Sequence, residues 1–275
     1  MHESLSIRAT TYALLALFVL MVAVPLFWMV TTALKSNKDL YEDFTYLPRR
    51  PTFQHFVRVV QREDLLTNIR NSLAVASTTT AVTVVVSAFA AFSIVRYRYW
   101  GREWVGRLIL FKYLLPTAML FIPLYTIVVA LGLGNTLKSL MLTYLSFTVP
   151  FCTWMLMGYF RSIPPELEEH AMVDGCTKLG ALFRILFPLS APGIVASAIF
   201  SFTLAWNEFL LALVFTSDHT TMTIPIKLSM MMVGDQYIWG QLMAGAVLAS
   251  VPITILYFLA QRFVVQGLAA GAVKG

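Results

Sequence analysis

Charged side chains are scarce in this sequence. Only 12% of its 275 residues are Asp, Glu, Lys or Arg, whereas 58% are hydrophobic. A soluble domain of this length carries roughly twice that charged share, so the composition excludes a soluble globular protein. We predict a membrane protein in which residues 1–275 form a single membrane domain. The net charge of +6 does not indicate a nucleic-acid partner, because basic residues beside membrane spans are the usual topology signal.

Groups that carry catalysis are few as well. The sequence contains no Gly-x-x-x-x-Gly-Lys-Ser/Thr loop, so this chain does not hold ATP phosphates in the usual way. Its four histidines are scattered at positions 2, 55, 170 and 219 and suggest neither a Ser-His-Asp set nor a metal cluster. Cys152 and Cys176 lie in different contexts and predict no disulfide. We therefore predict a protein that is not an enzyme and has no catalytic or metal-ligating residue.

Long apolar runs, by contrast, are abundant. A membrane-spanning helix needs about 20 mostly apolar residues, and six runs satisfy this requirement. The predicted fold is therefore all-α, with six transmembrane helices and no cleavable signal peptide. The predicted spans are residues 11–34, 72–95, 108–131, 139–159, 191–214 and 242–264.

Arginine placement predicts the orientation. Residues 96–107, between the second and third spans, hold four arginines against one acid, Glu103. Arginines close to span ends favour the cytoplasm. Six spans then place the N-terminus, the C-terminus and residues 166–188 in the cytoplasm, with residues 35–70 and 216–241 outside.

The polar stretch from Glu166 to Pro188 predicts a helix, a glycine elbow and a second helix. Ser162 is expected to cap the first helix, and three glutamates occupy the first turn, where carboxylates favour the helix dipole. Asp174-Gly175 then breaks the pattern, because glycine adopts the left-handed cap conformation readily. Thr177 is expected to cap the second helix.

This stretch resembles the cytoplasmic coupling motif of binding-protein-dependent ABC importer permeases. That motif runs Glu-Ala-Ala, three residues, Gly, nine residues, Ile, one residue, Leu-Pro. The segments LGLGNTLKSLMLTY and QRFVVQGLAAGAVKG also resemble the smaller sugar-permease subunits, the maltose type included. An ordinary amphipathic loop is the alternative. The matching residues are Glu169, His170 in place of alanine, Ala171, Gly175, Ile185, Phe187 in place of leucine, and Pro188, while Asp174 resembles the carbohydrate branch.

The resemblance implies a permease subunit of an ATP-driven carbohydrate importer, located in the cell membrane and forming half of the translocation pathway. It implies a second homologous permease, an ATPase dimer on the cytoplasmic face and an extracytoplasmic substrate-binding protein as partners. ATP and magnesium would be bound by the ATPase, and no cofactor by this chain. The coupling contacts would be made by Glu169, His170, Ala171, Asp174, Gly175, Ile185 and Pro188.

Two other functions remain open. The chain could be a self-sufficient ion-coupled transporter or channel, although so few ionisable groups within the spans argue against it. It could also be a membrane scaffold with no transport role. The sequence does not identify the substrate: oligosaccharides, monosaccharides, polyols and glycerol-phosphate esters all fit.

Glu208 is the only acid well inside a predicted span. Its carboxylate is costly there unless it meets water, a partner or a ligand. One interpretation is that Glu208 lines the translocation pathway, flanked by Trp206, whose ring could stack on a sugar, and by Asn207. The other is an interhelical hydrogen-bond network with an interfacial aromatic.

Overall fold

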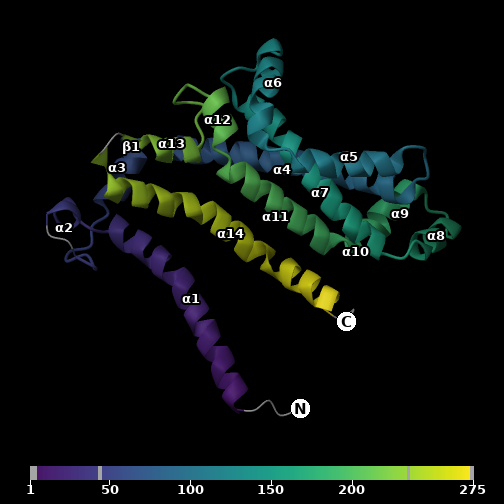
Figure 1. Cartoon of the computed structure of the whole chain (residues 1–275), viewed down its shortest axis with the longest axis horizontal. Helices are drawn as coiled ribbons and strands as arrows, with labels where there is room; N and C mark the ends of the chain where they lie inside the picture. Colours follow the sequence, from purple (N-terminus) through teal and green to yellow (C-terminus); the bar gives the residue numbers. More distant parts are fainter. Residues whose placement is uncertain (1–4, 43–44, 234–235, 273–275) are drawn as a thin grey trace. The chain divides into compact units, whose positions relative to one another are not determined.

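The computed structural model describes residues 5–42, 45–233 and 236–272 and is almost entirely helical (Figure 1). The exception is a short antiparallel pair of strands, β1 (Met232–Val233) and β2 (Gln236–Tyr237), in which Met232 is opposite Tyr237. The chain divides into two compact units, Met1–Leu66 with Lys227–Val251, and Thr67–Ile226 with Pro252–Gly275. Each unit is described separately.

Helices account for the framework of both units. The first unit contains α1 (Leu5–Ala33), α2 (Asn37–Tyr41), α3 (Gln54–Gln61), part of α13 (Ile224–Met230) and the first part of α14 (Trp239–Ala272). The second unit contains most of α4 (Leu65–Arg96), then α5 (Arg102–Leu114), α6 (Thr117–Ala130), α7 (Leu137–Ser162), α8 (Glu166–Val173), α9 (Lys178–Ala181), the π-helix η1 (Leu182–Leu186), α10 (Phe187–Leu189), α11 (Ala191–Asn207) and α12 (Leu210–Phe215).

Four of the described helices, α1, α4, α7 and α14, are each long and apolar enough to cross a membrane. Each largely covers one of the predicted runs 11–34, 72–95, 139–159 and 242–264. Two bent pairs of helices, at residues 102–130 and 178–207, raise the number of spans to as many as six if each pair is one span. The expectation of an all-α, polytopic membrane protein is therefore confirmed.

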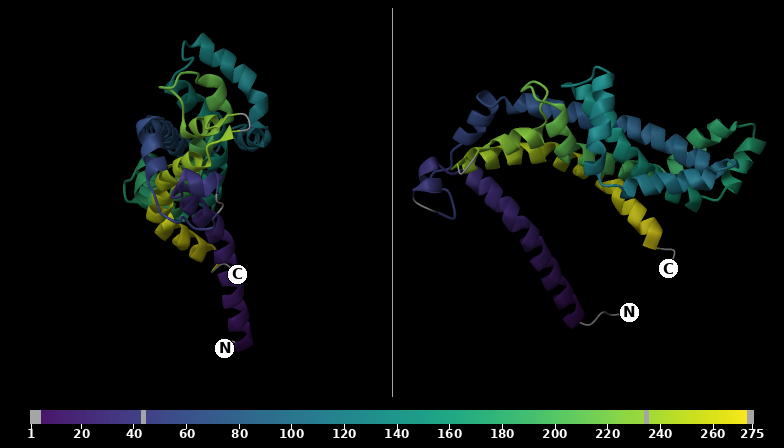
Figure 2. Two further views of the ribbon diagram at one scale, coloured as in Figure 1. Left: turned by 90° about the vertical axis from the view of Figure 1, so that its left-hand side faces the viewer. Right: turned by 45° about the horizontal axis from the view of Figure 1, so that its top comes forward.

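Residues 108–131 do not form the single helix that the sequence predicts. The chain bends by 104° between α5 and α6, and α6 turns steeply away from α5 (Figures 1 and 2). Leu115, at the break, has an extended ψ of 127°, because the ring of Pro116 disfavours helical geometry in the residue before it. Pro123, by contrast, lies inside α6.

The core of the second unit forms around α7, which packs against α5 and α11. Its side chains at the Ser162 end join those of α4 and η1 in one apolar cluster. Leu182 and Leu186 belong to the second half of the polar stretch, so this cluster fixes that half to two spans. Its most deeply buried members are Ala91, Leu156, Phe160, Leu182 and Leu186.

The contact between α7 and α11 depends on Gly193. A Cβ added there would lie 2.4–2.8 Å from three ring atoms of Tyr159, closer than packed atoms allow. We expect Gly193→Ala to cost about 1–3 kcal/mol, as overpacked sites do, and to lower the melting temperature of the purified protein. Gly158→Ala, on α7 itself with no atom within 4 Å of the added Cβ, is the matched control. Equal melting temperatures for the two variants would contradict this account.

In the first unit, α3 lies against the start of α14 through His55. A Cβ on Gly240 would lie 2.3 Å from Nε2 of the His55 ring, so only glycine permits this approach. The buried ring donates from Nε2 to the carbonyl of Lys35 at 3.1 Å. Burial lowers the pKa of His55 and outweighs the hydrogen bond to Lys35, which raises it, while Arg58 adds a smaller lowering effect. The imidazole is therefore neutral at pH 7, as a buried structural histidine should be.

Candidate functional site

The polar stretch begins directly after α7. Pro165, not Ser162, occupies the N-cap position of α8, and no side chain caps that helix. The prediction of a Ser162 cap is wrong, because α7 continues to Ser162 and its hydroxyl donates to the carbonyl of Tyr159 at 2.8 Å. The first turn of α8 is instead stabilised by the charges of Glu166, Glu168 and Glu169 near the positive end of the helix dipole.

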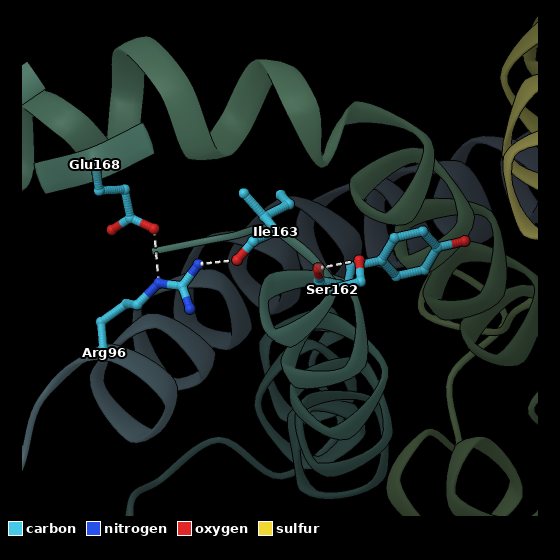
Figure 3. A network of polar contacts seen from close by, with 5 residues as sticks. Arg96, Ser162, Ile163 and Glu168 are labelled. Carbon is cyan, nitrogen blue, oxygen red and sulfur yellow. Dashed lines mark hydrogen bonds and ion pairs between the residues drawn. The ribbon is translucent and has the colours of Figure 1, made fainter. Parts of the chain in front are cut away.

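A buried ion pair fastens α8 to the end of α4 (Figure 3). Nε of Arg96 donates to Oε1 of Glu168 at 2.6 Å, and Nη2 of the same guanidinium donates to the carbonyl of Ile163 at 2.9 Å. The two charged side chains are only 13% and 9% exposed. One arginine therefore holds both the first turn of α8 and the connection that leads into it.

The elbow has the geometry of a Schellman cap. Gly175 has a φ of +91°, as the sequence predicts for a glycine that ends a helix. The N–H of Cys176 donates to the carbonyl of Ala171 at 2.9 Å, and the N–H of Gly175 donates to that of Met172 at 3.1 Å. These two bonds define the motif and fix the direction in which the chain leaves α8.

The second helical segment starts where the sequence predicts. The Oγ1 of Thr177 accepts from the N–H of Gly180 at 3.0 Å and caps α9. The chain then widens into the π-helix η1 immediately before Pro188, whose missing N–H and bulky ring prevent a regular α-helix over that turn. Leu182 and Leu186 are fully buried in the core, so α9–η1 is anchored along one face.

The opposite face of this unit is open. Glu169, His170 and Asp174 are exposed, and so are three apolar side chains, Leu167, Val173 and Leu179. Val173 is 86% exposed, which is a high exposure for an apolar side chain. Among the other predicted coupling residues, Pro188 is exposed, whereas Ala171 and Ile185 are half-buried.

Residues 191–214 are a second run that is not one helix. Helix α11 ends at Asn207, and Glu208 takes an extended ψ of 127°. Its carboxylate accepts from the backbone N–H groups of Leu211 at 2.8 Å and Ala212 at 3.0 Å. Glu208 therefore caps α12 in a break between two helices and does not lie within one continuous span, as residues 191–214 were expected to form.

The two neighbours of Glu208 lie in different environments. Trp206 is 3% exposed and its ring stacks on that of Phe202, with centroids 5.7 Å apart. A ring covered in this way is not available to stack on a sugar. Asn207 is exposed, and its Nδ2 donates to the carbonyl of Thr203 on its own helix at 2.8 Å.

The capping role of Glu208 predicts how the stabilities of its variants should rank. Glu208→Gln keeps one acceptor oxygen for the start of α12, whereas Glu208→Leu removes both and leaves two N–H groups without an acceptor. We expect the leucine variant to lose about 1–3 kcal/mol and the glutamine variant less, measured by thermal melting. Asn207→Ala, which removes one exposed hydrogen bond, is the control. A leucine variant as stable as the glutamine variant would rule out a capping role.

Sequence reasoning missed Glu168 and Arg96 as members of this site. The weak signal for Glu168 is its position, because Glu168, Ala171 and Met172 share the inward face of α8 at three- and four-residue spacing. Because Glu166, Glu168 and Glu169 are the same residue type, the sequence does not indicate which of them forms the ion pair. The signal for Arg96 is its position at the end of an apolar span, where a charged side chain can reach polar residues outside the membrane.

These features define a predominantly helical, multi-pass membrane protein that carries a polar helix–elbow–helix unit at the ends of two spans. Residues 83–270 match the family described as binding-protein-dependent transport system inner membrane component, and the chain belongs to that family. Its function is accordingly transport, as a permease subunit, and it is a membrane protein.

Named relatives agree along nearly the whole chain. The sulfoquinovosyl glycerol transport system permease protein SmoH of Agrobacterium fabrum is 37% identical over 91% of this chain and 88% of its own. The trehalose/maltose transport system permease protein MalG of Thermococcus litoralis is 33% identical over 98% and 96%. A solved bacterial ABC transporter involved in alginate import has the same fold, with a TM-score of 0.81, 20% identity and coverage of 96% and 99%.

Proposed function

We propose that this chain is one of two homologous permease subunits in an ATP-driven carbohydrate importer. It would form half of the translocation pathway, with an ATPase dimer on the cytoplasmic side and an extracytoplasmic binding protein on the other. ATP and magnesium would be bound by the ATPase. The names of the relatives support the substrate class, since the transporters of SmoH and MalG are named for a sugar glycoside and for disaccharides.

One observation supports the coupling role above all others: the α8–η1 unit is fixed to two spans on one face and open on the other. Arg96 fastens it to α4, and Leu182 and Leu186 join it to the core made by α4 and α7. A push on the exposed face would therefore reach both spans without first deforming the elbow. Domain movements of this kind are the usual basis of alternating access.

The exposed face supplies the contact with the ATPase in this proposal. Leu167, Val173 and Leu179 would be covered by the ATPase, and the exposed carboxylates of Glu169 and Asp174 would meet cationic groups there. Ala171, Gly175, Ile185 and Pro188 would shape the unit instead of touching the partner. His170 adds a polar contact beside Glu169.

Reversing the charge of Glu169 tests the contact. We expect Glu169→Lys to insert and fold normally, because the side chain is exposed, but to lose most binding-protein-stimulated ATP hydrolysis and most sugar uptake in reconstituted vesicles. Glu166→Lys, in the same turn and also exposed, controls for charge alone. Full stimulation and uptake by Glu169→Lys would refute the proposed contact, and uptake by this chain alone would favour ion coupling.

The proposed orientation places both termini and the α8–η1 unit in the cytoplasm. Cys176 in the elbow is partly exposed, whereas Cys152 is fully buried, so labelling reports on Cys176 alone. A membrane-impermeant thiol reagent is expected to miss Cys176 in intact cells and to label it in inverted vesicles. Strong labelling in intact cells would reverse the orientation.

A further inference from the structure

A cavity of about 410 Å³ opens where α4 ends, α5 begins and α7 ends, within the second unit. It borders the apolar cluster that contains Leu182 and Leu186, because Ile94 and Met157 belong to both, and none of the proposed coupling residues lines it. Three arginines and one acid, Glu103, stand around it over an apolar floor. The residues that matter here are the charged Arg102, Arg107 and Arg161 and the apolar Ile94, Leu110 and Trp154.

The arginines leave the cavity with an excess of positive charge. Glu103 is 4.0 Å from Arg107, and both side chains are more than two-thirds exposed, so this pair is weak. Arg102 uses Nη1 to donate to the carbonyl of Tyr97, which leaves its other N–H groups for a ligand. Within the described residues, Arg161 makes no ion pair. Three guanidinium groups in this arrangement suit the oxygens of a phosphate.

The surroundings of the cavity are those of a membrane surface. Arg161 lies in the last turn of α7 and Arg102 in the first turn of α5, so the charges lie at the level of span ends. No residue of α5 is buried, and its exposed face carries large apolar side chains. Below the charges, Trp154 is 48% and Leu110 is 37% exposed. Apolar surface therefore continues downward from the charged rim.

We propose that this cavity binds the headgroup of an anionic phospholipid. The guanidinium groups of Arg107 and Arg161 donate to the phosphate oxygens, and the acyl chains descend past Leu110 along the apolar face of α5. Basic pockets between spans are a recognised way to hold such headgroups. A soluble phosphate shares the headgroup chemistry and would use the arginines, but it would make no use of the apolar floor.

Native mass spectrometry tests this proposal on the full-length chain, in the assembly in which it is purified from membranes. The probes are phosphatidylglycerol, zwitterionic phosphatidylcholine and inorganic phosphate. We expect the unaltered protein to retain phosphatidylglycerol in preference to phosphatidylcholine. Arg107→Gln combined with Arg161→Gln should weaken that retention at least roughly tenfold, since two charge-assisted contacts are lost.

Arg98→Gln is the matched control, because Arg98 is an exposed arginine of the same loop that does not line the cavity. It should retain the lipid as the unaltered protein does. If the double variant fails to assemble, Arg161→Gln alone carries the test. Equal loss in Arg98→Gln would overturn the proposal in favour of diffuse surface charge. Equal retention of phosphatidylcholine would also overturn it, and displacement by millimolar phosphate would assign the cavity to a soluble anion.

Discussion

Glu168→Gln is expected to abolish most coupled transport while the protein still inserts into the membrane. The substitution leaves the Arg96 guanidinium, 13% exposed, with the Ile163 carbonyl as an acceptor but without its counter-charge. Removing one partner of a buried ion pair costs about 3–5 kcal/mol. Helix α8 lacks a side-chain cap, so this loss should detach its first turn from α4 before the spans are affected.

The measurements are sugar uptake and binding-protein-stimulated ATP hydrolysis in vesicles, together with thermal melting. Arg96→Met combined with Glu168→Leu removes both charges and should recover much of the melting temperature, since apolar pairs replace buried ion pairs at little cost. Glu103→Gln, which breaks the exposed pair with Arg107, should have almost no effect. A Glu168→Gln protein that behaves like Glu103→Gln would show that the ion pair does not hold the unit.

Local signals in the sequence were sufficient to predict the conformation of the elbow. Gly175 and Thr177 were both predicted in their observed roles, because a left-handed cap and a threonine N-cap depend on residues within a few positions of each other. The apolar runs likewise predicted the four long helices, since hydrophobic length alone determines which segments can span a bilayer.

Contacts distant in sequence could not be predicted in this way. Arg96 and Glu168 are 72 residues apart, and nothing in either neighbourhood indicates the other. The preference for carboxylates in the first turn of a helix applies equally to Glu166, Glu168 and Glu169. The structure separates them, because only Glu168 faces inward.

The broken spans show a second limit. Pro116 explains why the helix breaks after Leu115, but the size of the bend, 104°, does not follow from a proline, and α6 packs against α7 and α12 beyond it. At Glu208 neither proline nor glycine marks the break. The carboxylate itself replaces the missing helical acceptor for two N–H groups, so a polar residue that looked like a pathway group is placed as a helix cap.

Gly175→Pro is expected to eliminate coupled transport, with Gly175→Ala intermediate. Proline fixes φ near −65°, whereas Gly175 has a φ of +91°, so the elbow cannot form. The substitution also removes the N–H that donates to the Met172 carbonyl. An alanine Cβ meets no atom within 4 Å, so Gly175→Ala costs only the backbone strain, about 1–2 kcal/mol.

Gly132→Pro separates coupling from general damage. Gly132 has a φ of +67°, and its N–H donates to the carbonyl of Val129, so proline causes the same two losses there as at Gly175. It lies between α6 and α7, outside the α8–η1 unit. We expect Gly132→Pro to lower the melting temperature while each assembled complex still couples ATP hydrolysis to uptake. Gly175→Pro should yield complexes that hydrolyse ATP without responding to the binding protein. The direction of the elbow matters for transport only if it controls how the two spans move. If both variants lose uptake only in proportion to the amount of complex assembled, the elbow contributes stability alone.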